Sequence, residues 1–249
     1  MQDKNYLIEI ATSDFVTTVA AAAGAADRIE LCANLAEGGT TQSHATIRAC
    51  REKLNVQLYP IIRPRGGDFL YTTEEFEIML ADVLYCKELG CDGIVVGLLN
   101  RDGNIDKVRT AQIIERGYPL GVTFHRAFDR CIDPFRALEE LISIGCERIL
   151  SSGQQPSVTD GLELVHQLNE MADDRIIIMP GSGVRKENIK WIAEKTGCHE
   201  FHSSLRGRSP SLMEFRHPSF ESQEESYNNN AIDPQEVRLL REALTNAAS

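Results

Sequence analysis

Short apolar runs alternate with amphipathic segments along the whole chain. Eight runs have the length and the β-branched content of buried strands. They are residues 7–12, 28–33, 57–64, 93–99, 121–128, 148–153, 175–183 and 200–206. Because segments with helical periodicity separate these runs, the pattern predicts parallel strands joined by crossover helices.

Helix start signals support this alternation. Thr72 and Glu75 have the spacing of a capping box at the start of one amphipathic segment. Asp133 and Pro134 have the order of an N-cap and a first helical residue, and the same Asp-Pro pair precedes the last segment. Since eight strand–helix units are the number that closes a barrel, we expect one α/β domain over residues 1–249, a (β/α)8 TIM barrel. A doubly wound open sheet is the alternative.

One long connection interrupts this rhythm near the C-terminus. Residues 207–232 are rich in Ser, Glu and Asn, which predicts a polar loop before the last helix. Together they form a C-terminal loop and helix extension. The loop could cover the barrel mouth or reach a neighbouring subunit.

Composition limits the class of partner. The 249 residues include 26 Lys and Arg against 37 Asp and Glu, for a net charge of −11. An acidic surface disfavours nonspecific binding to nucleic acids and anionic membranes. No run approaches the roughly 18 to 20 apolar residues that cross a bilayer, and the N-terminal residues lack a signal-peptide pattern. We therefore expect a cytoplasmic protein with no nucleic-acid or membrane partner.

The seven cysteines are odd in number and scattered, and no C-x-x-C occurs. This spacing predicts reduced, buried thiols rather than a disulfide framework or a structural zinc site. All seven lysines lie in predicted helices or near the N-terminus, which argues against a Schiff-base enzyme with a lysine on a strand.

Strand alternation directs several ionisable side chains into the barrel, because residues two apart on a strand share a face. The inward set is Glu9, Glu30, Arg63, His125 and His202. Buried charges must pair with one another or serve a site. One hypothesis is an internal ion-pair network. The other is a polar pocket at the C-terminal ends of the strands, with Glu9, Glu30, Arg63 and His125 as catalytic groups.

Four residues near the last two strands suggest that an anion binds there. Gly181 and Gly183 lie at the end of the seventh strand, and His202 and Ser203 lie in the eighth. Glycines let backbone N–H groups approach an anion, and the N-terminus of the following helix favours negative charge. Barrels often bind a phosphate at this position. A plain turn is the alternative interpretation.

Charged residues also follow two other strands. Arg65 and Asp68 lie in the loop after the third strand, and Arg126 follows the fifth. Each is a candidate ligand-binding residue, because the loops at this end of a barrel build its site. Alternatively, Asp68 caps its own loop and the arginines are solvated.

Several blocks of sequence resemble the CutC family, which is named for copper homeostasis. They are ADRIELCANLAEGGTTQS, IIRPRGGDFLY, VTFHRAFD, SSGQ, MPGSGV and EFHSS, in this order. The resemblance implies a cytoplasmic (β/α)8 barrel that assembles as a homo-oligomer, often a dimer. It also implies binding of monovalent copper and a role in copper tolerance or trafficking.

The copper ligands implied by this resemblance are incomplete here. In some relatives copper binding is ascribed to two inward cysteines on the first two strands. The second position is Cys32, but the first is Ala11. Cu(I) is soft and favours two or more thiolate or thioether ligands, so Cys32 is a metal candidate without its partner. His125, His202 and Met179 are possible second donors.

Two functional hypotheses follow. One is a copper-homeostasis protein that binds or carries Cu(I). The other is a barrel enzyme of the isomerase or lyase type, acting on a small metabolite with or without a phosphate group. The predicted barrel interior, with Cys32 as its one cysteine beside the five charged or imidazole groups of the inward set, suits acid–base chemistry better than Cu(I).

Overall fold

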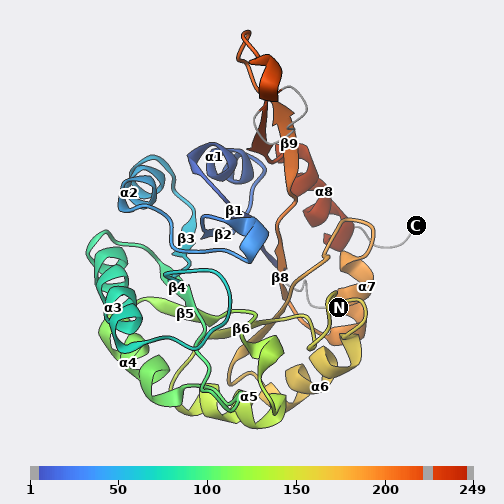
Figure 1. Ribbon diagram of the computed structural model, residues 1–249. Coiled ribbons are helices and arrows are strands. Elements are labelled where there is room, and N and C mark those ends of the chain that lie inside the picture. Colours follow the sequence, from blue (N-terminus) through green and yellow to red (C-terminus); the bar gives the residue numbers. More distant parts are fainter. Residues whose placement is uncertain (1–5, 221–226, 246–249) are drawn as a thin grey trace.

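The chain folds into a ring of parallel strands enclosed by helices (Figure 1). The structure is a computed structural model and describes residues 6–220 and 227–245. The barrel strands are β1 Leu7–Thr12, β2 Arg28–Leu31, β3 Gln57–Pro60, β4 Gly93–Val96, β5 Gly121–Phe124, β6 Arg148–Ser151, β7 Ile177–Pro180 and β8 Glu200–Ser203. The predicted (β/α)8 TIM barrel is confirmed, and the open-sheet alternative is not.

A helix follows each barrel strand along the chain. The helices are α1 Phe15–Ala23, α2 His44–Lys53, α3 Thr73–Glu88, α4 Lys107–Gly117, α5 Pro134–Ser143, α6 Leu162–Ala172, α7 Ile189–Thr196 and α8 Pro234–Thr245. The predicted start signals are confirmed: Thr72 and Glu75 form a capping box at α3, and Asp133 caps α5 with Pro134 as its first residue. None of the helices in the described part of the chain is long and apolar enough to cross a membrane.

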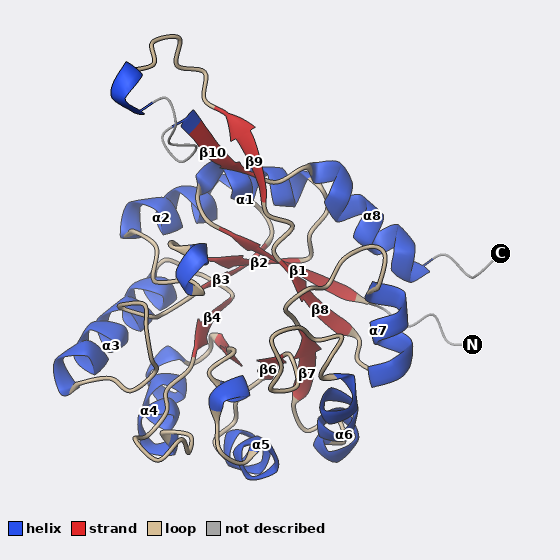
Figure 2. Ribbon diagram, turned by 45° about the vertical axis from the view of Figure 1, so that its right-hand side comes forward, coloured by secondary structure: helices blue, strands red, loops and turns tan. Residues whose placement is uncertain are grey.

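Two four-stranded sheets make up the ring. Their strand orders are β3-β2-β1-β8 and β4-β5-β6-β7. A parallel bridge between Ile61 and Val95 joins β3 to β4, where the Ile62 N–H donates to the Val95 carbonyl at 2.8 Å. On the other side β7 lies beside β8, which completes the ring (Figure 2).

The observed strands end earlier than the predicted ones. The third strand was expected over residues 57–64 but ends at Pro60, and the fifth was expected over 121–128 but ends at Phe124. Apolar residues continue into the buried first part of each loop, so hydrophobicity alone overestimates strand length. Arg63 and His125 therefore lie just after their strands, yet both side chains stay buried.

The predicted polar connection over residues 207–232 contains two short strands, and its residues 221–226 lie outside the described part of the chain. Strands β9 Gly207–Pro210 and β10 Asn228–Ala231 pair antiparallel within it, and the 3-10 turn Pro218–Phe220 lies between them. These polar strands lack the alternation that signals a half-buried strand. The arm formed by β9 and β10 projects away from the ring beside α1, rather than over the strands (Figures 1 and 2).

Strand alternation separates two kinds of interior. Outward residues such as Ile8, Ile10 and Ile29 belong to the large apolar core that includes buried residues of the helices. Inside the ring, a small apolar cluster consists of Cys32, Tyr59, Ile61 and Val95. The rest of the barrel interior is largely polar.

Candidate functional site

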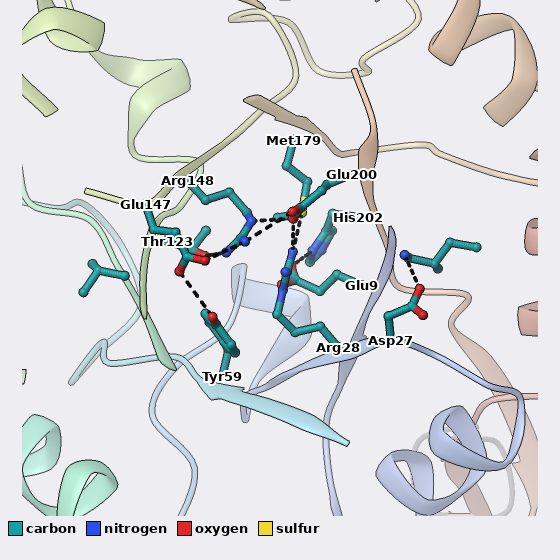
Figure 3. A network of polar contacts seen from close by, with 12 residues as sticks. Glu9, Asp27, Arg28, Tyr59, Thr123, Glu147, Arg148, Met179, Glu200 and His202 are labelled. Atoms are coloured by element: carbon teal, nitrogen blue, oxygen red, sulfur yellow. Dashed lines mark hydrogen bonds and ion pairs between the residues drawn. The ribbon is translucent and has the colours of Figure 1, made fainter. Parts of the chain in front are cut away.

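The barrel interior near the N-terminal ends of the strands, called its lower part here, holds a network of buried ion pairs (Figure 3). Arg28 Nε donates to Glu9 Oε2 at 2.5 Å, and Arg28 Nη2 donates to Glu200 Oε2 at 2.7 Å. Arg148 binds the same Glu200 oxygen at 2.6 Å and Glu147 Oε1 at 3.0 Å. Of the five inward residues, Glu9 and His202 belong to this network, whereas Glu30, Arg63 and His125 form no ion pair with the described residues.

Sequence reasoning missed most of this network, although the signal was available. Arg28 lies two residues before Glu30, and Glu200 lies two residues before His202, so each pair shares a strand face. Arg28, Arg148 and Glu200 are the first residues of their strands. Most of the predicted site residues lie in or after the C-terminal halves of the strands, so most of this layer at the N-terminal ends was not predicted.

A cavity of about 660 Å³ opens above the network, at the C-terminal ends of the strands. This is the end at which barrel proteins build their sites. The predicted site residues that line it are Glu30, Arg63, His125, Arg126, Gly183, His202 and Ser203. The tertiary structure thus brings together residues from five strands or the loops that follow them.

Other predicted site residues lie outside this cavity lining. Glu9 lies below it, within the ion-pair network. Arg65 pairs with Asp68 at 3.0 Å and with Glu75 at 2.6 Å in the loop after β3. At Gly181 an added Cβ would overlap the Leu150 side chain, so this glycine leaves packing space.

Glu9, Glu30 and His202 form a compact cluster at the floor of the cavity. His202 Nδ1 lies 2.7 Å from Glu9 Oε1. Each of the three residues has one side-chain atom that could ligate a metal, and these three atoms lie within 4.8 Å of one another. Oε2 of Glu30 is buried and has no hydrogen-bond partner among the described residues. The cluster therefore combines a paired carboxylate, an imidazole and an unpaired carboxyl oxygen.

Burial and neighbouring charges separate the protonation behaviour of these groups. Burial and the nearby Glu9 carboxylate raise the pKa of Glu30 to about 7, against the opposing effect of His202. Burial disfavours the Glu9 carboxylate, but Arg28 and His202 hold its pKa well below its usual range. Burial also opposes the charged form of His202, yet the carboxylates of Glu30 and Glu9 raise its pKa.

His125 lines the cavity from the opposite sheet. Its Nδ1 accepts a hydrogen bond from the Ala127 N–H at 3.1 Å, so the neutral ring carries its proton on Nε2. That atom is buried and has no acceptor among the described residues. Burial and the Arg63 guanidinium lower the pKa of His125 to about 3. The ring is therefore a neutral hydrogen-bond donor at physiological pH.

Arg63 donates hydrogen bonds to backbone carbonyls at the mouth of the cavity. Its Nη1 donates to the carbonyls of Glu37 and Gly39, at 2.9 and 2.8 Å, and its Nη2 donates to that of Gly67 at 2.8 Å. The guanidinium also lies over the Phe69 ring. Its Nε is buried and has no partner in the described part of the chain. Arg63 is thus a buried cation without a carboxylate partner.

The cavity lining is rich in arginine. Its five arginines are Arg63, Arg126, Arg130, Arg185 and Arg206. Within the described residues only Arg126 forms an ion pair, with Asp129 at 2.8 Å. The sequence interpretation missed Arg130, Arg185 and Arg206. Each follows the end of a barrel strand, which is the signal that could have found them.

The surroundings of Cys32 do not fit a Cu(I) site. Cys32 is fully buried and packs against Tyr59, Ile61 and Val95, and no second sulfur belongs to this cluster. Its Sγ donates to the Thr12 carbonyl at 3.3 Å. Burial and the Glu30 carboxylate raise the pKa of the Cys32 thiol well above its ordinary value, which disfavours the thiolate that Cu(I) prefers.

The Met179 sulfur, a candidate second donor, is also occupied. It lies 3.3 Å from Arg28 Nη2, within the buried ion-pair network. Cys32 does not line the cavity, where the two histidines lie. The soft ligand set implied by the family resemblance is therefore not assembled around Cys32.

Comparison with known proteins identifies the family. The sequence model of the CutC family matches residues 6–207. The chain belongs to the CutC family. Its strands β1 to β8 and the lining residues up to Arg206 lie within the matched region, so the cavity belongs to the shared part of the fold.

Individual relatives cover nearly the whole chain. A "family protein CutC" of Chromobacterium violaceum is 46% identical over 244 residues, which is 97% of this chain and 99% of the relative. The human "copper homeostasis protein cutC homolog" is 44% identical over 86% of this chain and 78% of the relative.

A solved structure supports the same assignment. The crystal structure named for copper homeostasis protein CutC of Streptococcus agalactiae superposes with a TM-score of 0.76 at 33% identity. The match covers 79% of this chain and 97% of that chain. The chain is thus a copper-homeostasis family member, and these comparisons do not favour the alternative prediction of an isomerase or lyase.

Proposed function

We propose that this protein acts in copper homeostasis through its barrel-mouth cavity, where it binds a small anionic molecule. The names of its relatives support the first part of the proposal. The chemistry of the cavity supports the second part, because it offers hydrogen-bond donors and positive charge to a ligand that enters from solvent.

One observation carries the proposal. Three residues that line the cavity, Glu30, Arg63 and His125, each have a buried polar side-chain atom with no partner among the described residues. An unsatisfied buried polar group costs about 1–3 kcal/mol. Two of these atoms, Arg63 Nε and His125 Nε2, are N–H donors. An oxyanion is the class of ligand that accepts hydrogen bonds from such donors.

The distribution of charge agrees with this ligand class. The protein as a whole has a net charge of −11. Its cavity nevertheless holds four arginines that form no ion pair with the described carboxylates, namely Arg63, Arg130, Arg185 and Arg206. A concave site of one charge sign concentrates ligands of the opposite sign. Guanidinium groups also match the geometry of carboxylates and phosphates.

A binding titration tests the anion site. Inorganic phosphate and malonate should bind, whereas uncharged malonamide should not. Because charge-assisted hydrogen bonds contribute about 1.5–3 kcal/mol, replacing Arg185 and Arg206 by Gln should weaken anion binding at least tenfold. Arg48→Gln, on the exposed side of α2, is the matched control. Equal binding by the double variant and the control would contradict the proposal.

A copper titration tests whether the protein binds Cu(I) tightly through Cys32. Anaerobic competition with a chromogenic Cu(I) chelator should show weak Cu(I) binding that Cys32→Ser does not change. Tight stoichiometric Cu(I) binding that is lost in Cys32→Ser would mean that Cys32 recruits a second soft ligand. In that case the Cu(I) site implied by the resemblance would hold.

We also propose a cytoplasmic location and assembly as a homodimer. All seven cysteines are free and buried, which agrees with a reducing compartment. The arm carries exposed apolar side chains at Leu212, Met213 and Phe215, which suit contact with a second copy. Light scattering at several protein concentrations would measure the mass of the assembly.

A further inference from the structure

We propose that Glu9, Glu30 and His202 bind a divalent transition-metal ion at the floor of the barrel-mouth cavity. The inference goes beyond the proposed anion site and does not depend on it. The ligand class is an ion that accepts one imidazole and two carboxylates, such as Zn²⁺ or Cu²⁺.

Strand register brings the three ligands together. Glu9 on β1 lies directly opposite His202 on β8, and Glu30 on β2 lies opposite Ala11, two residues along β1. One potential metal-ligand atom from each residue lies within 4.8 Å of the other two. Two ligands at 2.0–2.2 Å from one ion are at most roughly 4.4 Å apart. Small side-chain movements would therefore complete the site.

An unsatisfied atom indicates that the cluster accepts a cation. Glu30 is 5% exposed, and its Oε2 has no hydrogen-bond donor among the described residues. Buried carboxylate oxygens are normally satisfied. In the part of the chain that the structure describes, this is the one group of three or more His, Cys, Asp or Glu residues that could hold a metal ion.

The surroundings support the orientation of the ligands. Arg28 holds Glu9 Oε2 at 2.5 Å and leaves Oε1 directed at His202. Hydrogen bonds of this kind orient metal-binding carboxylates. Arg28 would repel an ion if its charge were uncompensated, but it also pairs with Glu200 at 2.7 Å. Arg148 shares Glu200 and also pairs with Glu147, so three carboxylates offset the two guanidinium groups of the network.

The site opens toward the cavity. Glu30 and His202 both line it, whereas Glu9 lies beneath them. An ion held at this position would have its protein ligands below and to the side, with coordination positions left toward the cavity. Among divalent ions, Cu²⁺ binds such nitrogen and oxygen ligands most tightly. The cluster thus suits Cu²⁺, whereas Cys32 was a candidate ligand for Cu(I).

Calorimetric titration of metal-free full-length protein with Zn²⁺, and electron paramagnetic resonance with Cu²⁺, test the site. One equivalent should bind, and the Cu²⁺ spectrum should show nitrogen hyperfine coupling. Glu30→Gln should weaken binding at least tenfold and keep the same fold by circular dichroism, because this oxygen has no hydrogen-bond partner among the described residues. Glu37→Gln removes an exposed carboxylate from the same cavity and is the matched control.

Each outcome decides the proposal. Tight binding that Glu30→Gln weakens and that Glu37→Gln and Cys32→Ser leave unchanged supports it. Equal affinities in the wild type and Glu30→Gln, or no saturable binding of either ion, would overturn it. A Cu²⁺ spectrum without nitrogen coupling would exclude His202 as a ligand and overturn it as well.

Discussion

His202 Nδ1 lies 2.7 Å from Glu9 Oε1, across the neighbouring strands β8 and β1. The same Glu9 carboxylate receives Arg28 Nε on its other oxygen. Glu9 therefore links the polar floor of the cavity to the ion-pair network below it. This single carboxylate bears on both the stability of the barrel and the geometry of the site.

Glu9→Gln should strongly destabilise the protein. The substitution removes one charge of a fully buried ion pair and leaves Arg28 without part of its compensation, and breaking such a pair costs about 3–5 kcal/mol. Urea denaturation measures the change in the free energy of unfolding. Glu140→Gln breaks the surface pair with Arg136 and should cost less than about 1 kcal/mol. Similar losses in the two variants would show that the buried pair contributes little.

Gly97→Ala should displace His125. A methyl group at this position would overlap Cε1 and Nδ1 of the His125 ring, and overpacking of a buried site costs about 1–3 kcal/mol. Thermal denaturation and the imidazole NMR signals of His125 would report the change. Gly117→Ala is the matched control, because its methyl group would lie 3.4 Å from Val83, an ordinary contact. An unmoved His125 signal in Gly97→Ala would contradict the close packing.

His125 should make stability depend on pH. Its pKa is about 3 in the folded protein and 6.5 as its ordinary value, so between these values the unfolded chain binds one more proton. This contribution is fully present above about pH 6.5 and is lost as pH falls toward 3. From pH 7 to 5 it amounts to about 2 kcal/mol.

Comparison of the wild type with His125→Gln isolates this contribution. Other groups also titrate in the same window, so the measured quantity is the difference between the two proteins in urea denaturation at pH 7 and pH 5. The variant should lose less stability than the wild type on acidification. Equal losses of stability in the two proteins would mean that the pKa of His125 is not lowered in the folded state.

Substitution of the arm should reduce self-association. Leu212, Met213 and Phe215 are 97%, 60% and 70% exposed, so replacing all three by Ser removes apolar contact surface without disturbing the barrel core. Light scattering should show a smaller mass at unchanged melting temperature. Val108→Ser, at a residue of α4 that is 70% exposed, is the control. An unchanged mass in the triple variant would place the contact between copies elsewhere.

The sequence by itself determined the class of fold and the direction of several side chains. Regular alternation of apolar runs and capped helices predicted eight strand–helix units of a parallel α/β fold, because each element carries its own periodicity and end signals, whereas closure of the ring is a tertiary feature. The two-residue period of a strand also directed Glu30 and His202 inward, and in the structure both line the cavity. These features depend on neighbours along the chain, so local pattern was enough.

Only the tertiary structure decided which inward groups meet. Periodicity assigns a face to Glu9 and Arg28 but not a depth in the barrel, and the register between β1, β2 and β8 sets their pairing. The enclosure of Cys32 by residues of neighbouring strands likewise depends on packing across the ring. Such distances join residues far apart in sequence, so the whole barrel must close before they are defined.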